Sequence, residues 1–160
     1  FHDVFVQGLV SPDQRPDSYA WAHELWRAFE STLECNRCRQ RYFAIPKRNA
    51  CPFCLQNRPG THYRLRSQNG RLLLAEHGRK VHPHHSSLRR EFDFSEDLCE
   101  FQVRPMRDGS SEMILRNLTA ANLQVVVGGS PRRCDRGKGF VLKGADKVVI
   151  GDIPYFVEPF

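Results

Sequence analysis

The sequence predicts an α+β fold in which helix and strand are segregated along the chain. Three observations predict it. Apolar residues recur at helical spacing before residue 34, four cysteines form two close pairs between residues 35 and 58, and short strand-like runs follow from about residue 62. We therefore expect a short helical segment over residues 1–34, a four-cysteine ribbon over 35–58 and an all-β sandwich over 62–160.

The helical segment is expected in two parts. A short amphipathic turn comes first and is marked by Val4, Phe5 and Leu9. After the break at Ser11-Pro12-Asp13, a helix begins at Asp17 or Ser18, both favoured N-cap types, and runs to about Leu33. Its apolar positions recur every four residues and are Trp21, Leu25 and Phe29, with Ala22 and Trp26 beside them. This apolar surface predicts a packing partner, for which chain upstream of Phe1 is a candidate.

The cysteine ribbon predicts a metal site. Each cysteine pair has two residues between its members, twelve residues separate the pairs, and the predicted ligands are Cys35, Cys38, Cys51 and Cys54. Two such knuckles supply the four thiolates of a tetrahedral Zn²⁺ site, and a closed set of four indicates a structural role. A redox pair or free thiols are the alternatives. Histidines are not needed as ligands, and the group from His82 to His85 is expected to form a turn with packed or exposed imidazoles.

The positive charge is concentrated around the cysteines. The chain has a net charge of +6, and the stretch from Glu34 to Arg64 holds seven Lys/Arg against one acid, so this stretch carries the whole excess. Such a patch suits phosphate, nucleic acid or an acidic protein face. The alternative is a solvated surface that offsets the negative charge of a thiolate–metal site.

The remaining chain reads as short strands separated by Gly, Asp, Ser and Pro. The expected strands are Arg71–Glu76, Glu100–Pro105, Glu112–Asn117, Leu123–Val127, Gly139–Leu142, Lys147–Ile150 and Tyr155–Val157. An antiparallel sandwich would bury one set of residues together, namely Leu73, Phe101, Leu115, Val125, Val141 and Val149.

Several classes of function are disfavoured by what the sequence lacks. No apolar run reaches the length of a membrane span, and Phe1-His2-Asp3 has no basic signal-peptide region. Paired cysteines with Cys99 and Cys134 left single indicate a reducing, cytoplasmic setting. No set of nucleophile, base and oxyanion donors is evident, so we expect no enzymatic activity. The chain has no initiator Met and is expected to be part of a longer protein.

The segment before the cysteines resembles the last helices of a protein-kinase C-lobe. The resemblance is carried by Phe5, Gly8-Leu9, Pro12, Arg15-Pro16-Asp17 and the helix with Trp21 and Leu25. A kinase end followed by Cys51-Pro-Phe-Cys54 is similar to bacterial eukaryotic-like Ser/Thr kinases of tellurium-resistance-type stress clusters. The resemblance implies that every catalytic element lies upstream of this chain. An ordinary loop followed by a helix is the alternative.

The C-terminal half resembles a forkhead-associated (FHA) sandwich. The resemblance rests on Leu115-Arg116-Asn117-Leu118 and on the run from Gly144 to Gly151. Ser95 to Phe101 matches the family's Ser-x-x-His loop and strand, but Leu98 stands at the His position. The usual Asn-Gly-Thr after Thr119 is Ala120-Ala121-Asn122 here. The resemblance therefore implies a degenerate FHA-like module with weak phosphothreonine binding.

Three functions follow from these expectations. The first is a non-catalytic regulatory and interaction region of a larger kinase, whose partner is another protein or the upstream kinase domain. The second is nucleic-acid binding by the basic ribbon, with Tyr42 and Phe43 as stacking residues. The third is recognition of phosphothreonine peptides.

Overall fold

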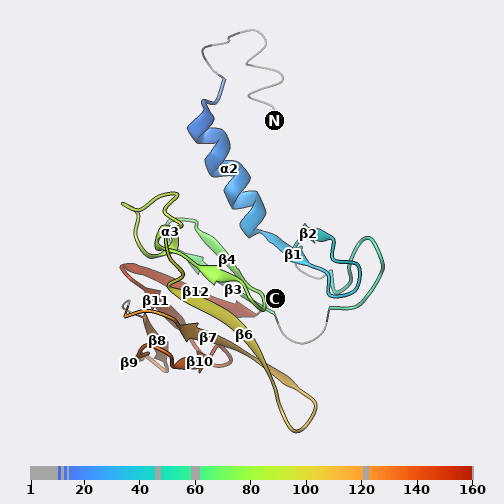
Figure 1. The fold of residues 1–160 in the computed structure, drawn as a ribbon, viewed down its shortest axis with the longest axis vertical. Coiled ribbons are helices and arrows are strands. Elements are labelled where there is room, and N and C mark those ends of the chain that lie inside the picture. The colour runs from blue at the N-terminus through green and yellow to red at the C-terminus, as the bar shows by residue number, and fades with distance from the viewer. Residues whose placement is uncertain are drawn as a thin grey trace.

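The structure is a computed structural model that describes residues 11, 13, 15–45, 48–58, 62–120 and 123–159. The amphipathic turn expected at Val4, Phe5 and Leu9 lies outside these residues. The predicted architecture of a short helix followed by antiparallel sheets is confirmed (Figure 1). None of the helices in the described part of the chain has the length and apolar content needed to cross a membrane.

The predicted helix is α2, Ser18–Glu30. Asp17 is its N-cap, and the Asp17 carboxylate accepts a hydrogen bond of 2.8 Å from the backbone N–H of Ala20. The prediction that the helix continues to Leu33 is wrong. The chain turns at Ser31 and enters strand β1, Thr32–Glu34, which pairs with β2, Arg41–Phe43. Strand pairing across the first cysteine knuckle thus outcompetes the helical pattern.

Ten further strands form two antiparallel sheets. The six-stranded sheet has the order β4 (Leu72–Ala75), β3 (Tyr63–Ser67), β12 (Ile153–Pro159), β11 (Lys147–Ile150), β8 (Leu123–Val127) and β9 (Ser130–Arg133). The four-stranded sheet has the order β10 (Gly139–Val141), β7 (Ser111–Asn117), β6 (Cys99–Pro105) and β5 (Lys80–Val81). A short helix, α3 (Pro83–Ser86), lies in the connection from β5 to β6. All seven predicted strands are present within two residues at each end, whereas β3, β5 and β9 were not predicted.

One hydrophobic core joins the two sheets. Of the predicted core residues, Leu73, Phe101 and Leu115 belong to this core, and Val125 is also buried. The prediction for Val149 is wrong, because Val148 and Ile150 point into the core and Val149 faces outward. Val141 is only half-buried. Strand β11 has apolar residues at three consecutive positions, Val148 to Ile150, and this run by itself does not reveal the alternation.

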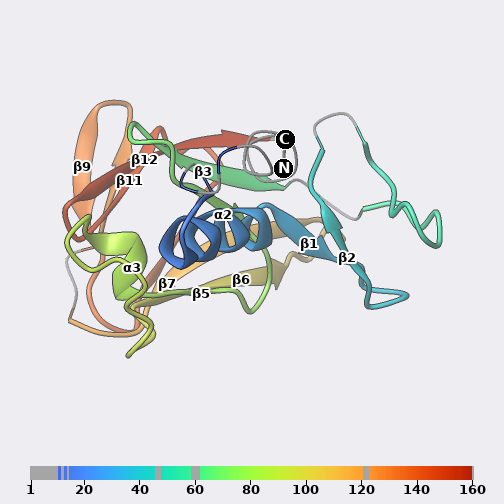
Figure 2. The ribbon, with the colours of Figure 1, turned by 90° about the horizontal axis from the view of Figure 1, so that it is seen from above.

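The helix and the ribbon rest against the sheets. Figure 1 shows α2 rising steeply from the sandwich with its C-terminal end nearest to the sheets, and Figure 2 shows β1 and β2 to one side of it. Strand β4, at the edge of the six-stranded sheet, contacts α2. From β4, Leu74 joins a second buried cluster whose other members are Leu33, Cys35, Tyr42 and Cys51. The ribbon and the sandwich therefore share a small core of their own.

Candidate metal centre

The two cysteine pairs adopt the same backbone geometry. In the first knuckle the N–H of Cys35 donates to the carbonyl of Gln40 (3.0 Å), and the N–H of Arg39 donates back to the carbonyl of Cys35 (2.9 Å). In the second, Cys51 donates to Gln56 (2.9 Å) and Leu55 donates to Cys51 (3.0 Å). The fourth residue after the first cysteine has a left-handed backbone in both knuckles, with φ of 62° at Arg39 and 58° at Leu55. The two cysteine pairs therefore form the same type of turn.

These turns bring the four predicted sulfur ligands together. Cys35 Sγ lies 3.6 Å from Cys54 Sγ, and Cys38 Sγ lies 3.7 Å from Cys51 Sγ. All four sulfur atoms lie within 4.8 Å of one another, with Cys35 and Cys51 buried and the other two half-buried. Four soft ligands at this spacing form a group that can hold a metal ion.

The surroundings of the cluster favour the thiolate form of Cys35 and disfavour that of Cys38. The backbone N–H groups of Cys38 and Arg37 lower the pKa of Cys35 to about 6. At Cys38, the backbone N–H of Gln40 favours the thiolate, but burial and the neighbouring sulfur atoms together raise the pKa to about 12. Four thiolates cannot share this volume without a cation. A bound metal ion deprotonates coordinating thiols outright and removes that repulsion.

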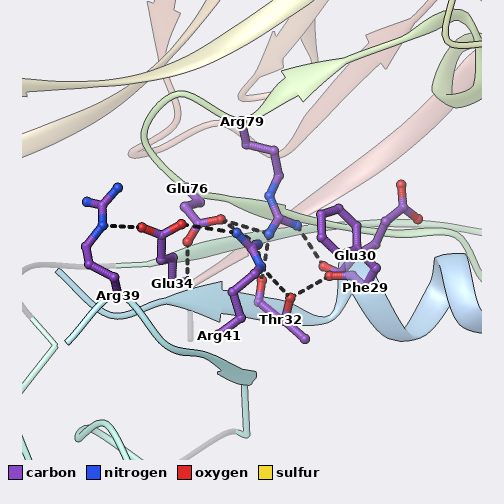
Figure 3. Close-up of polar contacts among 8 residues, drawn as sticks. All are labelled: Phe29, Glu30, Thr32, Glu34, Arg39, Arg41, Glu76 and Arg79. Carbon is purple, nitrogen blue, oxygen red and sulfur yellow. Dashed lines mark hydrogen bonds and ion pairs between the residues drawn. The ribbon is translucent and has the colours of Figure 1, made fainter. Parts of the chain in front are cut away.

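A network of charged side chains fastens the ribbon to the sandwich (Figure 3). Arg39 pairs with Glu34 at 2.7 Å, and Arg41 bridges Glu34 (3.6 Å) and Glu76 (3.1 Å). Glu76 lies directly after β4 and also pairs with Arg79 at 2.9 Å. These ion pairs therefore connect the first knuckle, through β2, to the sandwich.

Arg79 is the most enclosed member of this network. Its guanidinium donates to the backbone carbonyls of Glu30 (2.8 Å) and Thr32 (2.6 Å), where α2 ends and β1 begins (Figure 3). Arg41 also lies 4.9 Å from the centroid of the Phe29 ring. Cations at this position satisfy the last carbonyls of the helix and oppose its negative dipole end.

A second cluster of titratable groups lies where α2 meets α3, but its hydrogen bonds do not suit a metal. Glu30, His84 and His85 are all buried, and His85 Nε2 contacts the Glu30 carboxylate. The Nδ1 atom of His85 accepts the backbone N–H of His82 (2.9 Å), and that of His84 accepts the N–H of Phe92 (3.0 Å). Each neutral ring must then carry its proton on Nε2, which leaves no lone pair there for a metal ion. This cluster binds helix α2 rather than a cation.

No family model and no curated protein matches this chain.

Among the residues that the structure describes, the other histidines, cysteines and basic residues singled out in the sequence lie apart from the sulfur cluster or form contacts of their own. The imidazoles of His84 and His85 are packed, and burial lowers the pKa of His84 to about 4. Cys99 and Cys134 lie in the main core, apart from the sulfur cluster. Lys47 of the basic stretch lies outside the described residues. Arg39 and Arg41 of that stretch are ion-paired, as is Arg64, which contacts Glu158.

Sequence analysis missed the residues that dock the ribbon. Glu76 and Arg79 are separated by three positions around a turn, and nothing in that spacing points to contacts with residues more than 30 positions away. Glu30 and His85 are likewise 55 positions apart. The only local signal was the placement of charged residues next to a strand of buried leucines.

Proposed function

We propose that the ribbon holds one structural Zn²⁺ through Cys35, Cys38, Cys51 and Cys54. With Zn–S bonds of ~2.3 Å, the sulfur atoms of a tetrahedral site lie ~3.8 Å apart. The separations of 3.6 and 3.7 Å support that geometry. Four sulfur ligands close the coordination sphere and leave no position for a catalytic water, so the ion serves folding.

We propose further that the chain is a non-catalytic regulatory and interaction region of a larger Ser/Thr protein kinase. The observation that carries this proposal is the two-sided character of α2. One side is fixed, since Trp26 packs on Phe94 with ring centroids 4.3 Å apart and Glu30 is held by His85. The other side leaves Leu25 62% and Phe29 47% exposed. An apolar strip on a rigidly held helix suits docking to another folded protein, of which the upstream kinase domain is the first candidate.

Two observations in the sandwich support a degenerate FHA-like module that does not bind phosphothreonine strongly. Leu98, at the position where the family has its His, is buried in the main core. Each of the two arginines that follow a glycine before that loop is occupied internally. Arg71 donates to the backbone carbonyls of His84 and Ser87, and Arg79 donates to those of Glu30 and Thr32. Neither is available for a phosphate without breaking these contacts.

Nucleic-acid binding by the ribbon is not favoured. Tyr42, one of the two expected stacking residues, is only 7% exposed and belongs to the small core beside the cysteines. Arg39 and Arg41 already pair with carboxylates. These two arginines therefore serve the assembly of the ribbon itself.

The interaction role is tested with the polypeptide encoded immediately upstream of Phe1, produced separately. We expect it to carry kinase catalytic motifs and to bind this chain, and we expect Leu25→Glu to weaken that binding at least tenfold while zinc content stays constant. The chain alone, incubated with ATP, Mg²⁺ and a generic protein substrate, should give background turnover. An upstream polypeptide without kinase motifs, or turnover that is lost on a point mutation of this chain, contradicts the proposal.

A further inference from the structure

The outward face of the six-stranded sheet carries an aromatic ring between two cations. In the strand register, Phe156 of β12 lies directly opposite Arg66 of β3 on one side and Lys147 of β11 on the other. Directly opposed residues on one face have their Cβ atoms about 5 Å apart. The three side chains therefore form one row across the middle of the sheet. The Phe156 ring is 43% exposed.

The charge of this row is not neutralised by the sheet itself. In the described part of the chain neither Arg66 nor Lys147 has an acidic partner within ion-pair distance. The nearest acidic residue on the outward face of β12 is Glu158, and it forms an ion pair with Arg64 at 2.5 Å. The row thus presents two free positive charges to a ligand that would cover Phe156.

The surface continues beyond the row in both directions. On the β4 side, Arg66 itself lines a cavity of about 340 Å³ at the C-terminal end of α2, whose other lining residues are Arg27, Glu30, Ser31, Gly70 and Leu72. Past Lys147, the register places Val126 of β8 next on the same face. The register thereby places a strip across the sheet from β4 to β8, in which Arg66 and Lys147 lie among the apolar residues Leu72, Phe156 and Val126.

We propose that this face binds single-stranded nucleic acid, with a base stacked on Phe156 and phosphates held by Arg66 and Lys147. Stacking on an exposed aromatic needs only the face of a ring, and basic neighbours that follow the backbone supply the rest. An acidic peptide fits less well. Strand β12 is paired on both sides, with β3 and β11, so the row offers no free backbone edge to which a peptide strand can add. This site is separate from the ribbon and from the exposed strip of α2.

The test uses the zinc-loaded full chain and fluorescein-labelled oligo-dT and oligo-rU of about 15 nucleotides, a length in the range bound by single-strand binding domains. We expect saturable binding of one or both oligonucleotides. The slope of log K against log salt should be about −1.4 for two neutralised phosphates, and Arg66→Ala should reduce it by about 0.7. The two oligonucleotides distinguish DNA from RNA as the natural ligand.

Variants at Phe156 separate stacking from folding. Phe156→Leu should weaken binding at least about fivefold, whereas Phe156→Tyr should retain it, because only the ring face is needed. Phe53→Leu, which removes an exposed ring of the ribbon, should have no effect. Equal loss in the Leu and Tyr variants, loss in Phe53→Leu, or the absence of binding overturns the proposal. So does Phe156-dependent binding of poly-glutamate, which would make the face a site for acidic polypeptide.

Discussion

The guanidinium of Arg79 donates a hydrogen bond of 2.8 Å to the backbone carbonyl of Glu30, the last residue of helix α2. The same guanidinium reaches Thr32 in β1 and Glu76 after β4. One side chain of the sandwich thus joins the helix end, the ribbon and the edge strand. Because Arg79 is largely buried, removing it takes one donor from the Glu30 and Thr32 carbonyls and from the Glu76 carboxylate, which keeps Arg41.

Replacing Arg79 should loosen the whole junction. We expect Arg79→Ala to lower the free energy of unfolding by about 3 kcal/mol, since it breaks a largely buried ion pair and removes two hydrogen bonds to backbone carbonyls. Urea unfolding measures the loss. Arg89→Ala, at an exposed arginine in the connection after α3, is the matched control and should stay within about 0.5 kcal/mol of the wild type. Equal effects of the two variants would mean that Arg79 does not hold the junction.

Much of the sandwich could be predicted from sequence because its strands alternate or end at clear turns. Strands β8 and β11 were predicted to the residue, and the cysteine knuckles were located from spacing alone. The end of α2 could not be predicted. Local pattern extends the helix to Leu33, and only β1–β2 pairing and the distant Arg79 end it at Glu30. The outward direction of Val149 also depends on register, which a run of three consecutive apolar residues does not reveal.

The backbone of the second knuckle is strained at Leu55. Leu55 adopts a φ of 58° while its side chain is 78% exposed, so a left-handed backbone is imposed on a residue that gains little from packing. Leu55→Gly should raise the free energy of unfolding by about 1 kcal/mol, because glycine adopts this conformation without steric cost. Chemical unfolding of the zinc-loaded protein measures the change. Gln56→Gly, one position later, serves as control and should lower stability; a loss in both variants would argue against strain at Leu55.

Stability should fall below neutral pH because of His84. Burial lowers its pKa from 6.5 to about 4, so the folded state favours the neutral ring. The stability that depends on the neutral His84 ring is fully present above pH 6.5. It is lost as the pH falls towards 4, because the unfolded chain binds the proton first. The loss amounts to at most about 3 kcal/mol.

His84→Asn tests this dependence. The Asn carbonyl can still accept the Phe92 N–H but does not titrate, so the stability of this variant should change less between pH 6.5 and 4 than that of the wild type. His77→Asn, at a histidine that caps the N–H of Val103 in a more exposed position, should keep the wild-type dependence. If His84→Asn and the wild type lose stability in parallel, another group is responsible.

The claim on which the rest depends is that four cysteines bind zinc and thereby fix the ribbon against the sandwich. Elemental analysis of the protein purified under reducing conditions measures it directly. We predict about one Zn²⁺ per chain, retained in Cys134→Ser and absent in Cys51→Ser, whose ribbon should unfold locally. Metal-free wild-type protein that keeps its full stability, or a disulfide between Cys35 and Cys38 in reducing buffer, would contradict the account.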